Sequence, residues 1–101
     1  MKMLMMAHIP HEPFNQLVRE GRAAEVMAQI VDEIKPEAIY FTEQNGLRTA
    51  VAVINVNESS EIPRYAEPFF LQFEADCEFR IAMTPADLNR AGLELLGKRW
   101  G

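Results

Sequence analysis

A pair of residues near the middle of the chain, Asn45-Gly46, constrains the fold more than any other feature of the sequence. Asn-Gly is the pair that a two-residue primed hairpin turn prefers, because both residues tolerate a positive φ. The flanking segments, residues 37–43 and 47–56, are rich in the Ile, Tyr, Phe, Thr and Val that favour strands. Both faces of this hairpin are mostly apolar, and both therefore have to be covered.

The chain before the hairpin predicts one strand and one long helical segment. Residues 2–9 are short, apolar and followed by Pro10, which cannot donate to a strand ladder, so we expect a buried strand there. From residue 12 to residue 35, apolar side chains recur at three- and four-residue steps, which predicts a helix. Gly21 should bend or split this helix, and Pro36 should close it, since the residue before a proline avoids helical angles.

The chain after the hairpin predicts a second helix, a fourth strand and a terminal helix. Residues 62–73 have helical spacing, with Pro68 as the point where the regular helix ends or kinks. Residues 74–83 alternate between apolar and polar side chains, which predicts a strand. Residues 84–87, with the sequence Thr-Pro-Ala-Asp, begin the terminal helix with a capping hydroxyl, an early proline and an acid in the first turn.

The predicted order is strand, helix, strand, strand, helix, strand, followed by the terminal helix. This is the βαββαβ order of the α+β ferredoxin-like fold, so we expect residues 1–101 to form a single domain of this class. Right-handed crossovers place the first and third strands at the centre of a four-stranded antiparallel sheet, with both crossover helices on one face. The other face would be bare and largely apolar. A second copy of the chain is the simplest cover, so we expect a two-fold homodimer.

Charge and cysteine content limit the classes of partner and location. The chain has 101 residues and a net charge of -5, and this acidic balance argues against nucleic acid and anionic lipid as partners. No run of residues reaches the roughly 18 apolar positions that a membrane-spanning helix requires. Cys77 is the only cysteine, which excludes an internal disulfide and predicts a buried structural thiol. The start has no small-residue cleavage pattern, so the expected location is the cytoplasm.

His8, His11 and Glu12 form an H-x-x-H-E cluster where the first strand ends. Imidazole and carboxylate groups are zinc ligands, but the cluster lacks a third, distant ligand and Pro10 interrupts it, so we expect no metal site. A histidine can also accept a proton at neutral pH, which makes His8 and His11 candidates for a general base or a ligand clamp. The structural alternative is that Glu12 favours a helix N-terminus.

Other polar positions are candidates as well, each with a structural alternative. Tyr40 could orient a polar group of a ligand, although a mid-strand tyrosine is commonly core packing with one hydrogen bond. Arg80 shares a strand face with Glu78 and could bind a carboxylate, or the two could form an ion pair within the sheet or across a dimer. Glu43 and Arg48, which face each other beside the turn, are expected to form a cross-strand pair.

Three segments of the chain resemble a known group of proteins, and they are residues 10–15 (PHEPFN), 36–43 (PEAIYFTE) and 66–70 (AEPFF). Together with the element order, they make the chain similar to the dimeric alpha-beta barrel superfamily, and in particular to its small uncharacterised bacterial members. The resemblance implies ferredoxin-like domains of about 100 residues that pair their sheets into a barrel. In the enzymes of the superfamily, it implies a small organic ligand between sheet and helices, often without a cofactor. It assigns no catalytic residue.

The residues and the resemblance support two functional hypotheses. The first is a dimeric barrel that binds a small, partly apolar organic molecule between sheet and helices, either as a binding protein or as a cofactor-independent isomerase or monooxygenase. Its polar contacts would be His8, His11, Tyr40 and Arg80. The second is a non-catalytic interaction or scaffold domain, in which the same charges and histidines only stabilise the dimer.

Overall fold

A four-stranded antiparallel sheet forms the centre of the computed structural model, which describes residues 1–101. The strands are β1 (Lys2–Ile9), β2 (Ala38–Gln44), β3 (Leu47–Asn55) and β4 (Asp76–Ile81). They are ordered β2-β3-β1-β4, so that β1 and β3 are central while β2 and β4 form the two edges. The predicted α+β class and the central position of the first and third strands are thus confirmed, and the architecture is compatible with a ferredoxin-like fold.

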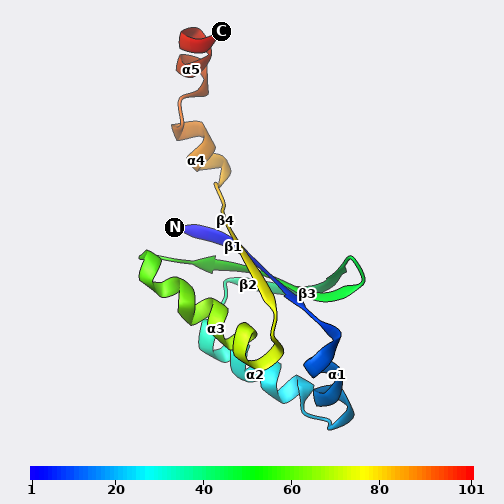
Figure 1. Ribbon diagram of the computed structural model, residues 1–101. Helices are drawn as coiled ribbons and strands as arrows, with labels where there is room; N and C mark the ends of the chain where they lie inside the picture. Colours follow the sequence, from blue (N-terminus) through cyan, green and yellow to red (C-terminus); the bar gives the residue numbers. More distant parts are fainter.

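Three helices cover one face of this sheet (Figure 1). The helices α1 (His11–Arg19) and α2 (Ala23–Ile34) follow β1, whereas α3 (Ile62–Phe73) connects β3 to β4. The segment after β1 is split at Gly21, as predicted, and the φ of 71° at this residue suits a glycine. The helix α3 continues through Pro68 to its C-terminal end. No helix of the chain combines the length and the apolar character needed to cross a lipid bilayer.

The hairpin has the predicted turn and register. Asn45 and Gly46 both adopt positive φ values, 53° and 80°, which a primed turn requires. Glu43 therefore pairs with Arg48 across the hairpin. This register sends alternate residues of β2 and β3 to opposite faces of the sheet.

The terminal segment differs from the prediction. In place of one helix it forms two short ones, α4 (Pro85–Arg90) and α5 (Leu93–Trp100), because Gly92 between them adopts a left-handed φ of 70°. The predicted start is confirmed, since the Thr84 hydroxyl accepts a hydrogen bond from the backbone N–H of Asp87. We call residues 82–101 the C-terminal arm. It extends away from the sheet and the helix layer (Figure 1).

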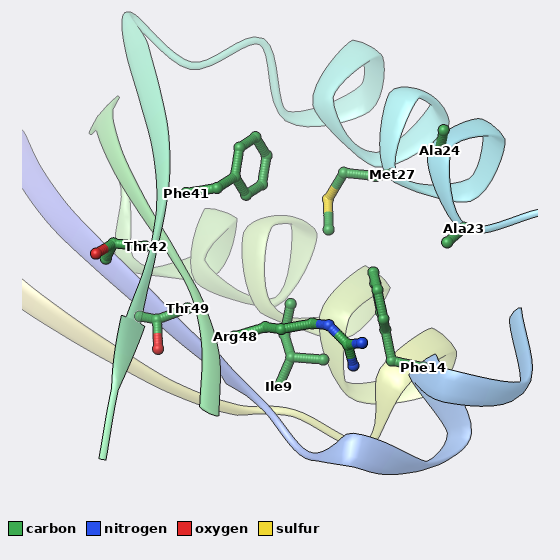
Figure 2. Close-up of a pocket in the computed structure, with 9 residues that line it drawn as sticks. All are labelled: Ile9, Phe14, Ala23, Ala24, Met27, Phe41, Thr42, Arg48 and Thr49. Atoms are coloured by element: carbon green, nitrogen blue, oxygen red, sulfur yellow. The ribbon is translucent and has the colours of Figure 1, made fainter. Parts of the chain in front are cut away.

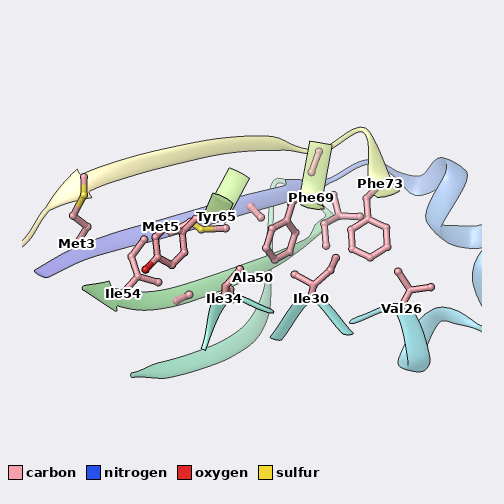
Figure 3. Close-up of a cluster of buried hydrophobic side chains, with 14 of the residues drawn as sticks. Met3, Met5, Val26, Ile30, Ile34, Ala50, Ile54, Tyr65, Phe69 and Phe73 are labelled. Carbon is pink, nitrogen blue, oxygen red and sulfur yellow. The ribbon is translucent and has the colours of Figure 1, made fainter. Parts of the chain in front are cut away.

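The hydrophobic core fills the space between the sheet and the helix layer (Figure 3). Every second residue of β1 is buried, and these residues point toward the helices. They form one cluster with Ile30 and Ile34 of α2 and with Phe69 and Phe73 of α3. Phe14 of α1 meets Phe73 edge to face, with ring centroids 5.1 Å apart, and so anchors α1 to α3.

The opposite face of the sheet, which we call the open face, carries no helix (Figure 1). Its centre is apolar and consists of Leu4 and Met6 of β1 together with Val51 and Val53 of β3. These side chains are half-buried by their neighbours in the sheet alone. The face is bare, as expected, but only its centre is apolar, because polar and charged side chains such as His8, Glu78 and Arg80 occupy its margins.

Candidate functional site

A cavity of about 370 Å³ lies between the hairpin and the helices α1 and α2 (Figure 2). Most of its wall is apolar, and its only polar residues are Arg48, Thr42 and Thr49. The full lining is Ile9, Phe14, Ala23, Ala24, Met27, Phe41, Thr42, Arg48 and Thr49. The cavity is thus in the place where the sequence hypothesis put a ligand, between sheet and helices.

Small side chains at the start of α2 leave the room for this cavity. The chain turns at Gly21, and α2 then begins with Ala23 and Ala24, which reach less far toward the hairpin than longer side chains would. Phe41 of β2 and Met27 of α2 point toward each other across the opening (Figure 2). The split of the helical segment therefore shapes the site as well as the fold.

Arg48 is the only charged group in the cavity wall. Its Nη1 donates to Asn15 Oδ1 at 2.7 Å, and its guanidinium lies 4.6 Å from the ring centroid of Phe14. Glu43, which faces it in the register, instead accepts a hydrogen bond from the backbone N–H of Gly46 at 3.0 Å. The predicted register is confirmed, but the expected ion pair does not form. The backbone of the turn binds the Glu43 carboxylate, while Asn15 of α1 binds the Arg48 guanidinium.

Arg48 consequently has hydrogen-bond donors that the chain does not use. A guanidinium carries five N–H donors, and only one of those of Arg48 has a side-chain acceptor within the protein. No buried side-chain nitrogen or oxygen lacks a partner, so the unused donors of Arg48 are accessible rather than sealed in the core. Arg19, Arg64 and Arg80, in contrast, each lie beside a carboxylate.

Three of the four predicted ligand residues lie on the open face, on strands β1, β2 and β4. His8 Nε2 is 3.0 Å from Glu78 Oε1, and Arg80 donates to Glu78 Oε2 at 2.9 Å. Arg80 and Glu78 thus form the ion pair within the sheet that was the structural alternative. Tyr40 is exposed and its hydroxyl makes no hydrogen bond within the chain, so it does not serve as core packing. None of these side chains lines the cavity.

A chain of polar contacts runs along the open face and ends at Thr49. The hydrogen bonds from Arg80 and His8 hold the pKa of Glu78 below its usual value, so this carboxylate only accepts. His8 Nε2 therefore donates to Glu78, while His8 Nδ1 faces Thr49 Oγ1 at 3.5 Å. The Thr49 hydroxyl donates to the backbone oxygen of Leu47 at 3.1 Å. Of the four predicted residues, only His8 thus contacts a residue that lines the cavity, and it does so from the open face.

The remaining predicted residue, His11, is exposed at the start of α1. Its neighbour Glu12 accepts hydrogen bonds from the backbone N–H of Gln16 at 3.2 Å and from Arg19 at 3.1 Å. Glu12 thus stabilises the beginning of α1, as the structural alternative stated. No group of three or more His, Cys, Asp and Glu side chains is arranged to hold a metal ion.

Cys77 is half-buried against the core and lies away from the cavity. Burial raises the pKa of its thiol to about 11, and the neighbouring charge of Asp76 acts in the same direction. The thiol is therefore protonated at neutral pH, which is the condition of a structural rather than a nucleophilic cysteine.

Sequence reasoning missed the residues that make the cavity. The sequence pairs Arg48 with Glu43 and gives the alanines at the start of α2 no role in a site. The available signal was the combination of two small residues after Gly21 with an arginine on the helix-facing side of the hairpin. Only the packing of α1 against the hairpin reveals that these groups meet.

Comparison with known proteins adds no assignment to this geometry. No protein-family model matches the chain, and no curated protein matches it either.

Proposed function

We propose that this chain is a homodimeric barrel domain that binds a small, partly apolar organic anion in the cavity beside Arg48. The observation that carries the proposal is Arg48 itself, a half-buried guanidinium with unused donors in an otherwise apolar wall. Guanidinium groups match the geometry of carboxylates and bind them through two parallel hydrogen bonds. The cavity volume of about 370 Å³ lies in the range of small-ligand sites.

The lining supports binding more than catalysis. None of the residues in the wall is an Asp, Glu, His, Lys or Cys, the groups that commonly transfer protons in enzymes. An isomerase or monooxygenase reaction in this cavity would need such a group, and His8, the titratable side chain that contacts Thr49, lies on the opposite face of the sheet. We therefore propose a binding role.

The exposed surface supports the homodimer. The chain exposes 6913 Å², whereas a folded monomer of this mass exposes about 5,800 Å². The excess is comparable to the roughly 800 Å² that each partner contributes to a stable interface. The open face has an apolar centre and no helix over it, so we propose that it packs against the same face of a second copy. In this arrangement His8, Tyr40 and Arg80 belong to the interface.

Calorimetric titration with matched ligands tests the anion site. The probes are benzoate and 3-methylbutanoate together with their amides, which keep the shape and remove the charge. We expect the wild-type chain to bind the carboxylates at least about tenfold more tightly than the amides, because hydrogen bonds to charged groups are worth about 1.5–3 kcal/mol. Arg48→Gln should abolish this preference.

Arg64→Gln is the matched control, because Arg64 lies on α3 and contacts Glu33 of α2 rather than the cavity. This variant should bind the carboxylates like the wild-type chain. If Arg48→Gln retains the preference for carboxylates, or if no probe of either kind binds, the anion site is wrong. In the second case the interaction or scaffold role becomes the better explanation of the dimer.

A further inference from the structure

The C-terminal arm carries a large share of the exposed apolar surface of the chain. Six of the 13 exposed large hydrophobic side chains lie in the arm, between Met83 and Trp100, and neither α4 nor α5 contains a buried residue. The radius of gyration is 17.1 Å, compared with about 13 Å for a compact domain of this length. The arm accounts for this elongation, because it projects from the end of β4 (Figure 1).

The helices of the arm are too short to be stable without a partner surface. The helix α4 has 6 residues and α5 has 8. Isolated helices in water are marginal below about 12–15 residues, because few hydrogen bonds offset the cost of nucleation. Packing of the apolar side chains of the arm against a partner surface would supply the stability that such short helices lack.

One face of α5 is suited to such packing. Leu93, Leu96 and Trp100 follow each other at three- and four-residue steps and so lie on the same side of the helix, with Gly97 between them. Lys98 lies away from this stripe, as does Leu95. A short helix with an apolar stripe is the form that binds in grooves on other proteins.

The fold has a groove that matches this helix face. It lies between α2 and the edge strand β2 and has a volume of about 600 Å³. Its lining is apolar apart from Asp32, and consists of Ala24, Met27, Ala28, Val31, Asp32, Ile39 and Phe41. Three of these residues, Ala24, Met27 and Phe41, also line the ligand cavity, so the groove and the cavity are continuous.

Charge supports the match between the arm and the groove. The charged residues of α2 are all acidic, namely Glu25, Asp32 and Glu33. The last turn of α5 carries Lys98 and Arg99. Opposite charges of this kind favour the docked orientation and speed association.

The arm lies away from the groove of its own chain. It leaves β4 beside the start of β1, where Ile81 pairs with Met3, at the edge of the sheet opposite β2. The groove flanks β2, about 14 Å across the sheet and on its helix side, whereas the arm extends away from the helix layer (Figure 1). When two sheets close a barrel around a two-fold axis parallel to the strands, however, β4 of one copy meets β2 of the other.

We propose that the two copies exchange their arms, so that α5 of each lies in the α2–β2 groove of the other. Leu93, Leu96 and Trp100 then face the groove, and the arm forms an outer wall of the ligand cavity that the single chain lacks. This inference rests on the proposed pairing of the two sheets. It adds that each binding site is completed by the second copy.

Cross-linking between two differently tagged chains tests the exchange. Both chains carry Cys77→Ser; one also carries Leu96→Cys in the arm, and the other carries Ala28→Cys in the groove. The chains are coexpressed and treated with a short bis-maleimide, and the products are separated by mass. We expect a covalent heterodimer. In the matched controls, Leu95→Cys replaces Leu96→Cys and Gln29→Cys replaces Ala28→Cys, because each is the sequence neighbour on another face of the same helix. The control pairs should cross-link at least about tenfold less.

A cross-link that forms only inside one chain carrying both Leu96→Cys and Ala28→Cys would overturn the exchange. Equal cross-linking in the control pairs would overturn it as well, because contact would then not depend on the helix face. Neither result bears on the anion site, which the calorimetric titration tests independently with Arg48→Gln.

Trp100, the only tryptophan of the chain, gives a second measurement on the unmodified protein. Its side chain is 80% exposed in the single copy. Docking should shift its emission to the blue and protect it from acrylamide, and dilution below the dissociation constant of the dimer should reverse both effects. A dimer whose Trp100 stays fully quenchable would disprove arm exchange while leaving the pairing of the sheets intact. A monomer at every concentration would disprove both.

Discussion

Arg48 and Arg80 show that the role of a charged residue depends on distant packing more than on local spacing. In the sequence each has a glutamate in reach, Glu43 across the turn and Glu78 two positions earlier, and each predicts an ion pair. Only Arg80 forms it. Arg48 instead donates a hydrogen bond to Asn15, which lies 33 positions away along the chain. Local patterns reveal which residues share a strand face, but not which helix end will contact them.

Cys77 allows a test of burial at a single side chain. Its pKa is raised to about 11 from a usual value of 9.0, so the folded state keeps the thiol proton over a range in which the unfolded state has lost it. The contribution of Cys77 to stability is therefore complete below pH 9.0 and declines as the pH rises toward 11. Alkylation with iodoacetamide, followed by mass spectrometry, should show a pH midpoint near 11 in the folded chain.

The urea-unfolded chain is the control for this measurement and should show its midpoint near the usual value of 9.0. A folded chain whose midpoint coincides with that of the unfolded chain would show that Cys77 is open to water. Its assignment as a structural thiol would then be wrong.

At the scale of elements, the sequence predicts most of the sheet correctly but misplaces the ends of some strands and helices. The bounds of β1 and the turn of the hairpin agree with expectation, because alternation and Asn-Gly are local signals. The fourth strand begins later than predicted, since Glu74 adopts a left-handed conformation that ends α3. Gly92 divides the terminal helix in the same way. Left-handed caps depend on the direction that the chain takes after the helix, and apolar periodicity alone does not locate them.

The packing of α3 onto the sheet predicts a large difference between two of its residues. Phe69 is 0% exposed within the core, whereas Leu71 is 76% exposed on the outside of the helix. Phe69→Ala should lower the free energy of unfolding by about 3–5 kcal/mol, because it removes buried surface and leaves a cavity. Leu71→Ala should change it by about 0.5 kcal/mol or less. Urea titration monitored by circular dichroism measures both, and equal losses would contradict the assignment of α3 to the core.

At the scale of the whole molecule, the sheet has an apolar centre on each of its two faces, and the helix layer covers only one of them. The sequence predicts this imbalance, since both faces of the hairpin are apolar and the element order supplies helices to a single side. The arm is a different case. Its apolar positions indicate that it packs, but a helical stripe carries no information about the surface that receives it. The structure adds that the arm extends from the domain and does not pack on it.

The open face gives a direct test of the proposed assembly. Val51 lies at its centre, between Met6 of β1 and Tyr40 of β2. Val51→Glu should convert the dimer to a monomer at micromolar concentration, because two buried carboxylates would face the apolar surface of the other copy. Light scattering coupled to size-exclusion chromatography measures the mass. Val18→Glu, on the exposed side of α1, is the control and should remain dimeric. A Val51→Glu chain that is still a dimer would place the interface elsewhere.

The alternation along β1 also bears on how such a protein can change over time. Its odd-numbered residues point into the core, and its even-numbered residues point to the open face. Substitutions at the two sets of positions therefore act on separate traits, the stability of the fold and the identity of whatever meets the sheet. Evolution can therefore change what pairs with the sheet by substituting even-numbered residues of β1, while the odd-numbered residues preserve the core and the fold of the domain.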